Sequence, residues 1–142
     1  MSDDDDNILP FPTIERVEEA LIKGFGIRFR YYTLVNHQPV AIEKPSEWVN
    51  EMARRMWMAK RSSDIDPWRV AETNIGDVRI STVFLGLDHS FSGDGPPVLF
   101  ETMIFGGRLD EFQDRCCTWD EAEAMHAEAV RQVRGGHLKV VK

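Results

Sequence analysis

The expected fold rests on the stretch Val78–Gly107, which reads VRISTVFLGLDHSFSGDGPPVLFETMIFGG. Two β-rich apolar runs, Val78–Leu87 and Val98–Phe105, flank a Ser/Gly/Asp/Pro cluster at Ser90–Pro97. This pattern is typical of a long hairpin, because the turn-forming cluster reverses the chain between two strands. Both alternating sets of residues in each run are apolar, so we expect the hairpin to be covered on both faces and to lie centrally in its sheet.

Apolar periodicity and capping residues predict further elements on both sides of this hairpin. Helices are expected at Ile14–Lys23, Glu47–Arg61 and from the Thr118 capping box to Gly135-Gly136, and strands at Ile27–Leu34, Pro39–Glu43 and Arg69–Thr73. The polar segment Arg108–Cys117 is expected to be irregular, and the final HLKVVK to be a frayed tail or an edge strand. The predicted fold is therefore α+β, with one antiparallel sheet of about five strands and two or three packed helices.

Length and composition indicate one domain. The chain has 142 residues, of which 42% are hydrophobic, which is enough for one buried core and too little for two. We expect residues 1–12 to be a disordered acidic leader and residues 13–142 to be a single α+β domain. Asp3–Asp6 supply four charges of the net −7 and leave −3 on the rest. With no basic stripe among aromatics, direct nucleic-acid binding is not expected.

The sequence lacks membrane and signal segments, and it also lacks a disulfide or zinc-binding pattern. No apolar run approaches the roughly 20 residues of a membrane-spanning helix, and the start MSDDDDNILP lacks a basic signal region. We therefore expect a cytoplasmic protein without a membrane partner. Cys116 and Cys117 are adjacent, so they cannot cross-link the fold, and they do not form a CxxC zinc pattern. No cofactor is expected, and whether the protein binds a divalent metal ion is left open.

The amino-acid sequence of the central stretch also resembles that of a known family. STVFLGLDHSFSGDGPPVLFETMIFGG, followed by Thr118-Trp-Asp-Glu-Ala-Glu and His126, is similar to small uncharacterised proteins encoded by tailed bacteriophages and prophages. The likeness extends more loosely to Tyr31-Tyr-Thr-Leu and Pro39-Val, and the sequence departs from it at Cys116, where an aromatic is expected, and over Arg54–Asp66. The resemblance implies a viral source and the cytoplasm of a host bacterium, but no mechanism, because the family has no established activity.

Asp88 and His89, at the mouth of the hairpin, and Glu101, on the returning strand, are the first candidates for chemistry. If His89 lies opposite Val98, Gly86 faces Glu101, and Asp88 lies one step along the same face. Two carboxylates there could share a proton or bind a divalent cation, with His89 as a base or ligand. The structural alternative is an Asx turn at Asp88, with Glu101 hydrogen-bonded or paired to an arginine.

Two other sets of residues have both a functional and a structural interpretation. His126 lies beside the apolar stripe of the last predicted helix, either as a hydrogen-bonded residue at the edge of the core or as a ligand with Asp88 and Glu101. Trp48, Met52 and Met56 recur every four residues on the predicted helix Glu47–Arg61. They could form a partner-binding surface, but a helical apolar stripe more often packs on a sheet, which is the reading we favour.

Two function classes follow. The first, which we favour, is a non-enzymatic phage accessory protein that binds a host or viral macromolecule and could inhibit a host defence factor. The second is a small metal-dependent enzyme or ligand-binding protein that uses Asp88, His89, Glu101 and His126. The lack of a convincing catalytic set makes an enzyme the less expected class, and the oligomeric state stays open.

Overall fold

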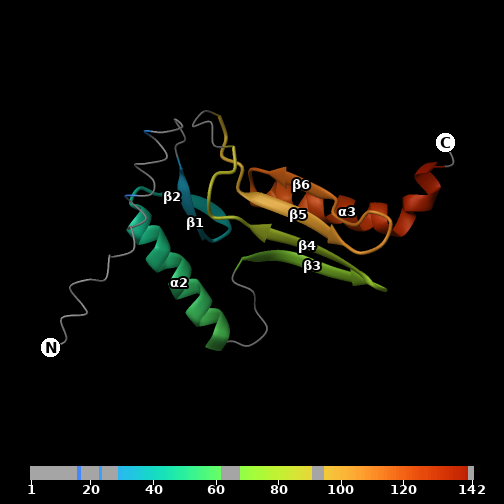
Figure 1. Cartoon of the computed structure of the whole chain (residues 1–142), viewed down its shortest axis with the longest axis horizontal. Helices are drawn as coiled ribbons and strands as arrows, with labels where there is room; N and C mark the ends of the chain where they lie inside the picture. The colour runs from blue at the N-terminus through green and yellow to red at the C-terminus, as the bar shows by residue number, and fades with distance from the viewer. Residues whose placement is uncertain (1–15, 17–22, 24–28, 62–67, 91–94, 141–142) are drawn as a thin grey trace, which may run out of the picture.

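The computed structural model describes residues 16, 23, 29–61, 68–90 and 95–140, with the backbone alone for 61 and 136–140. Within these residues, six strands form two antiparallel sheets that are accompanied by two long helices (Figure 1). This confirms the α+β class, but the expected single sheet is divided into one of two strands and one of four. The predicted leader, residues 1–12, and most of the predicted helix Ile14–Lys23 lie outside the described residues.

The larger sheet contains the predicted hairpin at its centre. Its strand order is β3 (Arg69–Ile75), β4 (Val78–Phe84), β5 (Phe100–Phe105) and β6 (Gln113–Cys116). In the β3–β4–β5 meander, the predicted strand Arg69–Thr73 lies beside the predicted hairpin. Strand β6 was not expected, because the segment Arg108–Cys117 is polar. It is an edge strand whose first three residues are exposed, so it lacks the apolar alternation by which strands are recognised.

Helix α3 (Trp119–Val140) covers one face of this sheet and closes the core (Figure 1). Strand side chains of that face are fully or almost fully buried, namely Ile80, Thr82, Phe84, Phe100, Thr102 and Ile104. Ala122 and Ala129 on the helix are also buried, and their small size lets the helix lie close to the strands. This arrangement confirms the predicted apolar stripe of the last helix.

The start of α3 agrees with the prediction, whereas its end agrees only in part. The Glu121 amide donates to Thr118 Oγ1 at 3.1 Å, and the Thr118 amide donates to Glu121 Oε1 at 3.1 Å, which confirms the predicted capping box. The predicted end at Gly135-Gly136 is confirmed only in part. Gly135 has a non-helical backbone (φ −109°, ψ 15°) that kinks the helix, which then continues to Val140. Helix therefore replaces the expected tail or edge strand over 137–140.

The smaller sheet pairs β1 (Tyr31–Val35) with β2 (Gln38–Ile42). The two central residues of its turn, Asn36 and His37, both have positive φ, at 50° and 67°, as a two-residue type I′ turn requires. Both strands were predicted within a few residues. Helix α2 (Pro45–Arg61) follows and contacts β1 and β2. Proline begins this helix, a position where its missing N–H costs nothing, so the helix starts two residues before the predicted Glu47.

Gly86 joins the two sheets. Its φ of +75° ends β4 and turns the chain away from β5. The Gly86 carbonyl then accepts from the Tyr32 amide at 2.8 Å, and the Asp88 amide donates to the Arg30 carbonyl at 2.9 Å. A Cβ at this position would also lie 3.3 Å from Trp48 Nε1. Glycine is therefore favoured here by both backbone conformation and space.

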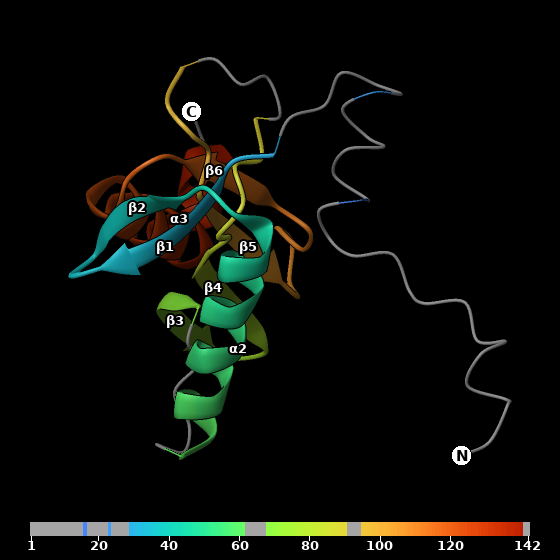
Figure 2. The same ribbon diagram turned by 90° about the vertical axis from the view of Figure 1, so that its left-hand side faces the viewer.

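The face of the larger sheet opposite α3 is less covered than expected. Ser81, Val83 and Met103 on that face are only half-buried. Helix α2 contacts β1 and β2 and lies beyond one end of the larger sheet (Figure 1), so that in the end-on view of Figure 2 it stands in front of β3 and β4. Among the described elements, the central hairpin is thus covered by a helix on one side only. Neither described helix is long and apolar enough to cross a membrane.

Candidate functional site

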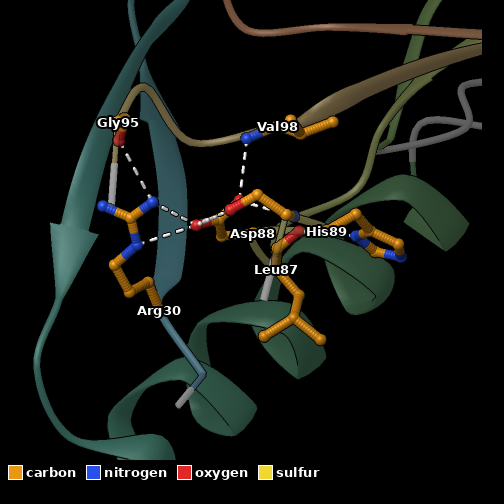
Figure 3. A network of polar contacts seen from close by, with 7 residues as sticks. Arg30, Leu87, Asp88, His89, Gly95 and Val98 are labelled. Carbon is orange, nitrogen blue, oxygen red and sulfur yellow. Dashed lines mark hydrogen bonds and ion pairs between the residues drawn. The ribbon is translucent and has the colours of Figure 1, made fainter. Parts of the chain in front are cut away.

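Asp88 lies at the junction of the two sheets and is 1% exposed (Figure 3). Its Oδ1 accepts from the amides of Ser90, at 2.9 Å, and Val98, at 2.8 Å. Its Oδ2 accepts from the Ser90 hydroxyl at 2.9 Å and from both Nε, at 2.7 Å, and a terminal nitrogen of Arg30. The bond to the Ser90 amide is the Asx turn of the structural alternative, so the geometry agrees with that interpretation.

The hydrogen bonds of Asp88 determine its charge state. Burial alone would raise the pKa of Asp88, but the donors on Ser90, Val98 and Arg30 outweigh it and hold the pKa below its usual value. A carboxylate has about four lone-pair sites, and here they are all directed at protein donors. Asp88 is therefore a saturated anion that fastens the chain before β1 to both ends of the hairpin loop.

His89 does not join this cluster. Its ring points to the opposite side of the backbone from Arg30, and its Nδ1 donates to the Leu87 carbonyl at 2.7 Å (Figure 3). The His89 amide does bond the Val98 carbonyl, at 2.9 Å, as the sequence suggested. The imidazole, however, is not placed beside the Asp88 carboxylate as a base would need to be.

Glu101 lies in a different place from the one predicted. It pairs with Val83, three residues before the expected Gly86, because residues 86–88 are inserted between the Leu85–Leu99 and His89–Val98 hydrogen bonds. An odd shift in register places a side chain on the opposite face. The Glu101 carboxylate accepts from Arg115 Nε at 2.9 Å and from the Gln113 amide group on β6. The carboxylate pair with Asp88 is thus not formed, and Glu101 has the arginine partner of the structural alternative.

His126 is buried between α3 and the larger sheet, with 7% of its surface exposed. Its Nε2 lies 2.8 Å from Thr73 Oγ1, and its Nδ1 lies 2.8 Å from Thr82 Oγ1. Thr82 Oγ1 in turn lies 2.5 Å from Thr102 Oγ1. Burial lowers the pKa of His126, so the neutral imidazole is favoured. His126 is therefore a hydrogen-bonded core residue and does not form a shared ligand set with Asp88 and Glu101.

The described residues contain neither a cluster of metal ligands nor an activated cysteine. No three His, Cys, Asp or Glu side chains in that part of the chain gather closely enough to hold a metal ion. Burial, with Glu121 nearby, raises the pKa of Cys116 to about 11. The pKa of Cys117 is also raised, again mainly by burial. Neither cysteine is therefore an activated nucleophile.

The apolar face of α2 is the feature without a structural explanation. Met56 is 52% exposed, Trp57 57% and Val49 42%, and Val49 and Met56, seven residues apart, lie on one side of the helix. Of the three residues that the sequence singled out, Trp48 and Met52 are half-buried and only Met56 is in solvent. The favoured interpretation, a stripe packed on the sheet, therefore holds for the first half of the helix and fails for the second. Val49 and Trp57 flank this four-residue repeat in the sequence, and both are exposed.

Polar contacts explain why α2 is oriented this way. Arg55 Nε donates to Thr33 Oγ1 at 3.2 Å, and another nitrogen of Arg55 donates to the Leu34 carbonyl. Thr33 Oγ1 donates to Glu51 Oε1 at 3.1 Å. Glu51 and Arg55 thus face β1. A helix that turns an ion pair toward its sheet while Met56 and Trp57 face solvent reverses the usual distribution.

A groove adjoins this exposed face. Trp48 and Met52 form one wall, and residues of the larger sheet and its approach form the other, namely Trp68, Val83, Phe84 and Leu85. The groove has a volume of about 390 Å³. Its lining is apolar, so the exposed face of α2 continues into a hollow that side chains of another molecule could enter.

Comparisons with known proteins do not extend this description. No protein-family model, curated protein or solved structure matches the chain.

Proposed function

We propose that this protein acts by binding another protein, with the apolar face of α2 and the adjoining groove as its contact surface. The observation that carries the proposal is the exposure of Met56 and Trp57 on a helix whose inner side is occupied by Glu51 and Arg55. Contiguous exposed apolar surface is characteristic of protein interaction sites. Tryptophan is also the residue type most enriched among those that dominate binding energy.

The size of the effect is sufficient for recognition. Full burial of a large exposed apolar side chain contributes about 1.5–3 kcal/mol, and Met56 and Trp57 are each about half exposed, so together they supply about 1.5–3 kcal/mol to an interface. The groove adds Trp48 and Met52 as walls around an inserted side chain. Methionine adapts its shape to a partner, which suits a surface that is preformed on one helix.

The resemblance to phage-encoded proteins supports a host or viral protein as the partner, met in the bacterial cytoplasm. Inhibition of a host defence factor is the form of action that this source favours. The enzyme alternative has less support, because Asp88, Glu101 and His126 lie in three separate networks with their own protein partners.

The test is affinity capture from lysate of the host bacterium, with wild type, Met56→Glu and Val35→Glu as bait. Val35 is 53% exposed on β1, so its substitution is a matched control that adds the same charge outside the proposed surface. We expect Met56→Glu to lose at least tenfold of the captured partner and Val35→Glu to retain it. Melting temperatures of all three baits verify that they are folded. Equal capture by both variants would contradict the proposed surface.

A further inference from the structure

A pocket of about 250 Å³ lies between α3 and the end of the larger sheet where β4 begins and β5 ends. This end of the sheet is the one away from β1 and α2 (Figure 1). Apolar side chains from both strands, the loop after β5 and α3 line the pocket, namely Val78, Ile104, Leu109 and Val133. Arg108 and Gln132 are the polar side chains of the lining. The pocket shares no residue with the α2 surface, so it is independent of the proposed function.

The loop that carries Arg108 and Leu109 is fixed by its own hydrogen bonds. The Gly106 amide donates to Asp110 Oδ1 at 2.7 Å, and the Phe112 amide donates to the Leu109 carbonyl at 3.0 Å. Gly106 has a φ of +91°, and a Cβ there would lie 2.8 Å from a backbone oxygen of the β3–β4 turn, so the loop packs closely against that turn. A wall that is formed before binding lowers the entropic cost of holding a ligand.

Arg108 supplies a positive charge beside this apolar lining. It is exposed, and among the residues that the structure describes it has no hydrogen-bond or ion-pair partner. Most described arginines do pair with a carboxylate, namely Arg30, Arg54, Arg55, Arg69, Arg79, Arg115 and Arg131. Asp110, two residues further on, is bound to the Gly106 amide instead. Gln132 donates one amide proton to Glu128 Oε1 at 3.1 Å and keeps the second. The lining therefore offers a cation and an amide donor to an acceptor from outside.

These features select a small anion with an apolar body. An engineered protein cavity of about 150 Å³ holds benzene, so the volume of this pocket accommodates roughly ten non-hydrogen atoms. We propose that the pocket binds a small monocarboxylate with an aliphatic or aromatic body. The carboxylate accepts from Arg108 and Gln132, because a guanidinium group binds carboxylates through charge-assisted hydrogen bonds. The body packs against Val78, Leu109 and Val133. Inorganic phosphate has no apolar part and would leave this lining without contact.

The site can be tested in the full-length protein with sodium hexanoate as the probe, at constant ionic strength. The amide NMR signals of Gly106, in the lining, and of Gly86, at the junction of the two sheets, are followed during the titration. We expect a saturable shift at Gly106, with a dissociation constant on the order of a millimolar or lower, and no shift at Gly86. Hexan-1-ol has a chain of the same length without the charge, and it should bind about fivefold more weakly.

Substitutions separate the role of the charge from that of the apolar lining. Arg108→Gln should weaken hexanoate binding about fivefold and leave hexan-1-ol binding unchanged. Arg134→Gln is the matched control, because Arg134 is also exposed and lies on α3 outside the lining, and this variant should bind hexanoate like the wild type. Val133→Trp adds bulk inside the pocket and should remove binding of both compounds. Melting temperatures verify folding, and the two arginine variants, both at exposed positions, decide the test if Val133→Trp does not fold.

An unchanged Gly106 signal would overturn the proposal. Equal affinity of the wild type for hexanoate and hexan-1-ol would also do so, because the pocket would then select neutral apolar molecules. Equal weakening by Arg108→Gln and Arg134→Gln would overturn it by assigning the attraction to the general charge of the surface. A tripeptide ending in leucine that binds about tenfold more tightly than hexanoate would replace the small molecule with the C-terminus of a polypeptide. None of these results affects the capture experiment with Met56→Glu, so the two proposals fail separately.

Discussion

The two helices of this protein use their apolar residues in opposite ways. Helix α3 buries Ala122 and Ala129 completely or nearly so against the four-stranded sheet. Helix α2 keeps Met56 and Trp57 more than half exposed and turns Glu51 and Arg55 toward β1. Large apolar residues on a helix therefore need not stabilise the fold. Stability is concentrated where α3 meets the sheet, and α2 provides a surface.

The largest expected effect tests this division directly. Phe84→Ala and Ile104→Ala should each lower the free energy of unfolding by about 2–5 kcal/mol, because both side chains are buried and truncation leaves a cavity. Met56→Ala on α2 should change it by no more than about 0.5 kcal/mol. Urea denaturation of the three variants measures the difference. Similar losses at Met56 and Ile104 would mean that α2 contributes to the core.

The junction of the two sheets should respond more strongly than the outer face of the larger sheet. Asp88→Asn should cost about 1–3 kcal/mol, and more if the charge of Arg30 is left without a partner. Glu101→Gln should cost about 1 kcal/mol or less, because Arg115 is 41% exposed and water screens the pair. Thermal denaturation with and without magnesium, manganese or zinc measures both. Stabilised variants, with a metal-dependent rise in the wild type, would favour the enzyme alternative.

The stability of the buried side of α3 should depend on pH, because it contains His126. The pKa of His126 is lowered by burial, so below its unfolded value of about 6.5 the unfolded state binds more protons. Stability should therefore be fully present above about pH 6.5. It should fall with decreasing pH, by at most about 1.4 kcal/mol per pH unit from this group, until the folded pKa is passed.

The control for this pH effect is His126→Gln, which keeps hydrogen-bonding groups toward Thr73 and Thr82 but does not titrate. Melting temperatures between pH 5 and 8 should show a flatter profile for the variant. Parallel profiles of variant and wild type would assign the acid loss to other groups. Asp88, whose pKa is lowered, loses its contribution only as the pH falls below about 4.

The smallest effect concerns the thiols beside α3. A pKa of about 11 leaves Cys116 almost entirely protonated at pH 8, so its reaction with a disulfide reagent should be at least tenfold slower in the folded protein than in urea. Cys117→Ser should change the melting temperature little, since the residue is only half-buried. Rapid labelling of Cys116 in the folded state would indicate that the end of β6 opens readily.

Local signals predicted much of the fold. The capping box of Thr118 and Glu121 and the β4–β5 hairpin depend on residues close together in sequence, and both are present. The register of the hairpin could not be predicted, because it depends on Gly86 leaving β5 to pair with β1, a contact between distant segments. Strand β6 was missed because an exposed edge strand needs no apolar pattern.

Most elements, the antiparallel hairpin and an apolar stripe on each helix could be predicted from the sequence, because they follow from local propensities and periodicity. What each stripe contacts depends on how distant segments pack together. Arg55 and Glu51 bind β1 through Thr33, and this orients α2 with Met56 and Trp57 outward. The same packing places Asp88, Glu101 and His126 in separate networks. The physical reason is that partners are chosen by packing between segments far apart in the chain, which no single segment encodes.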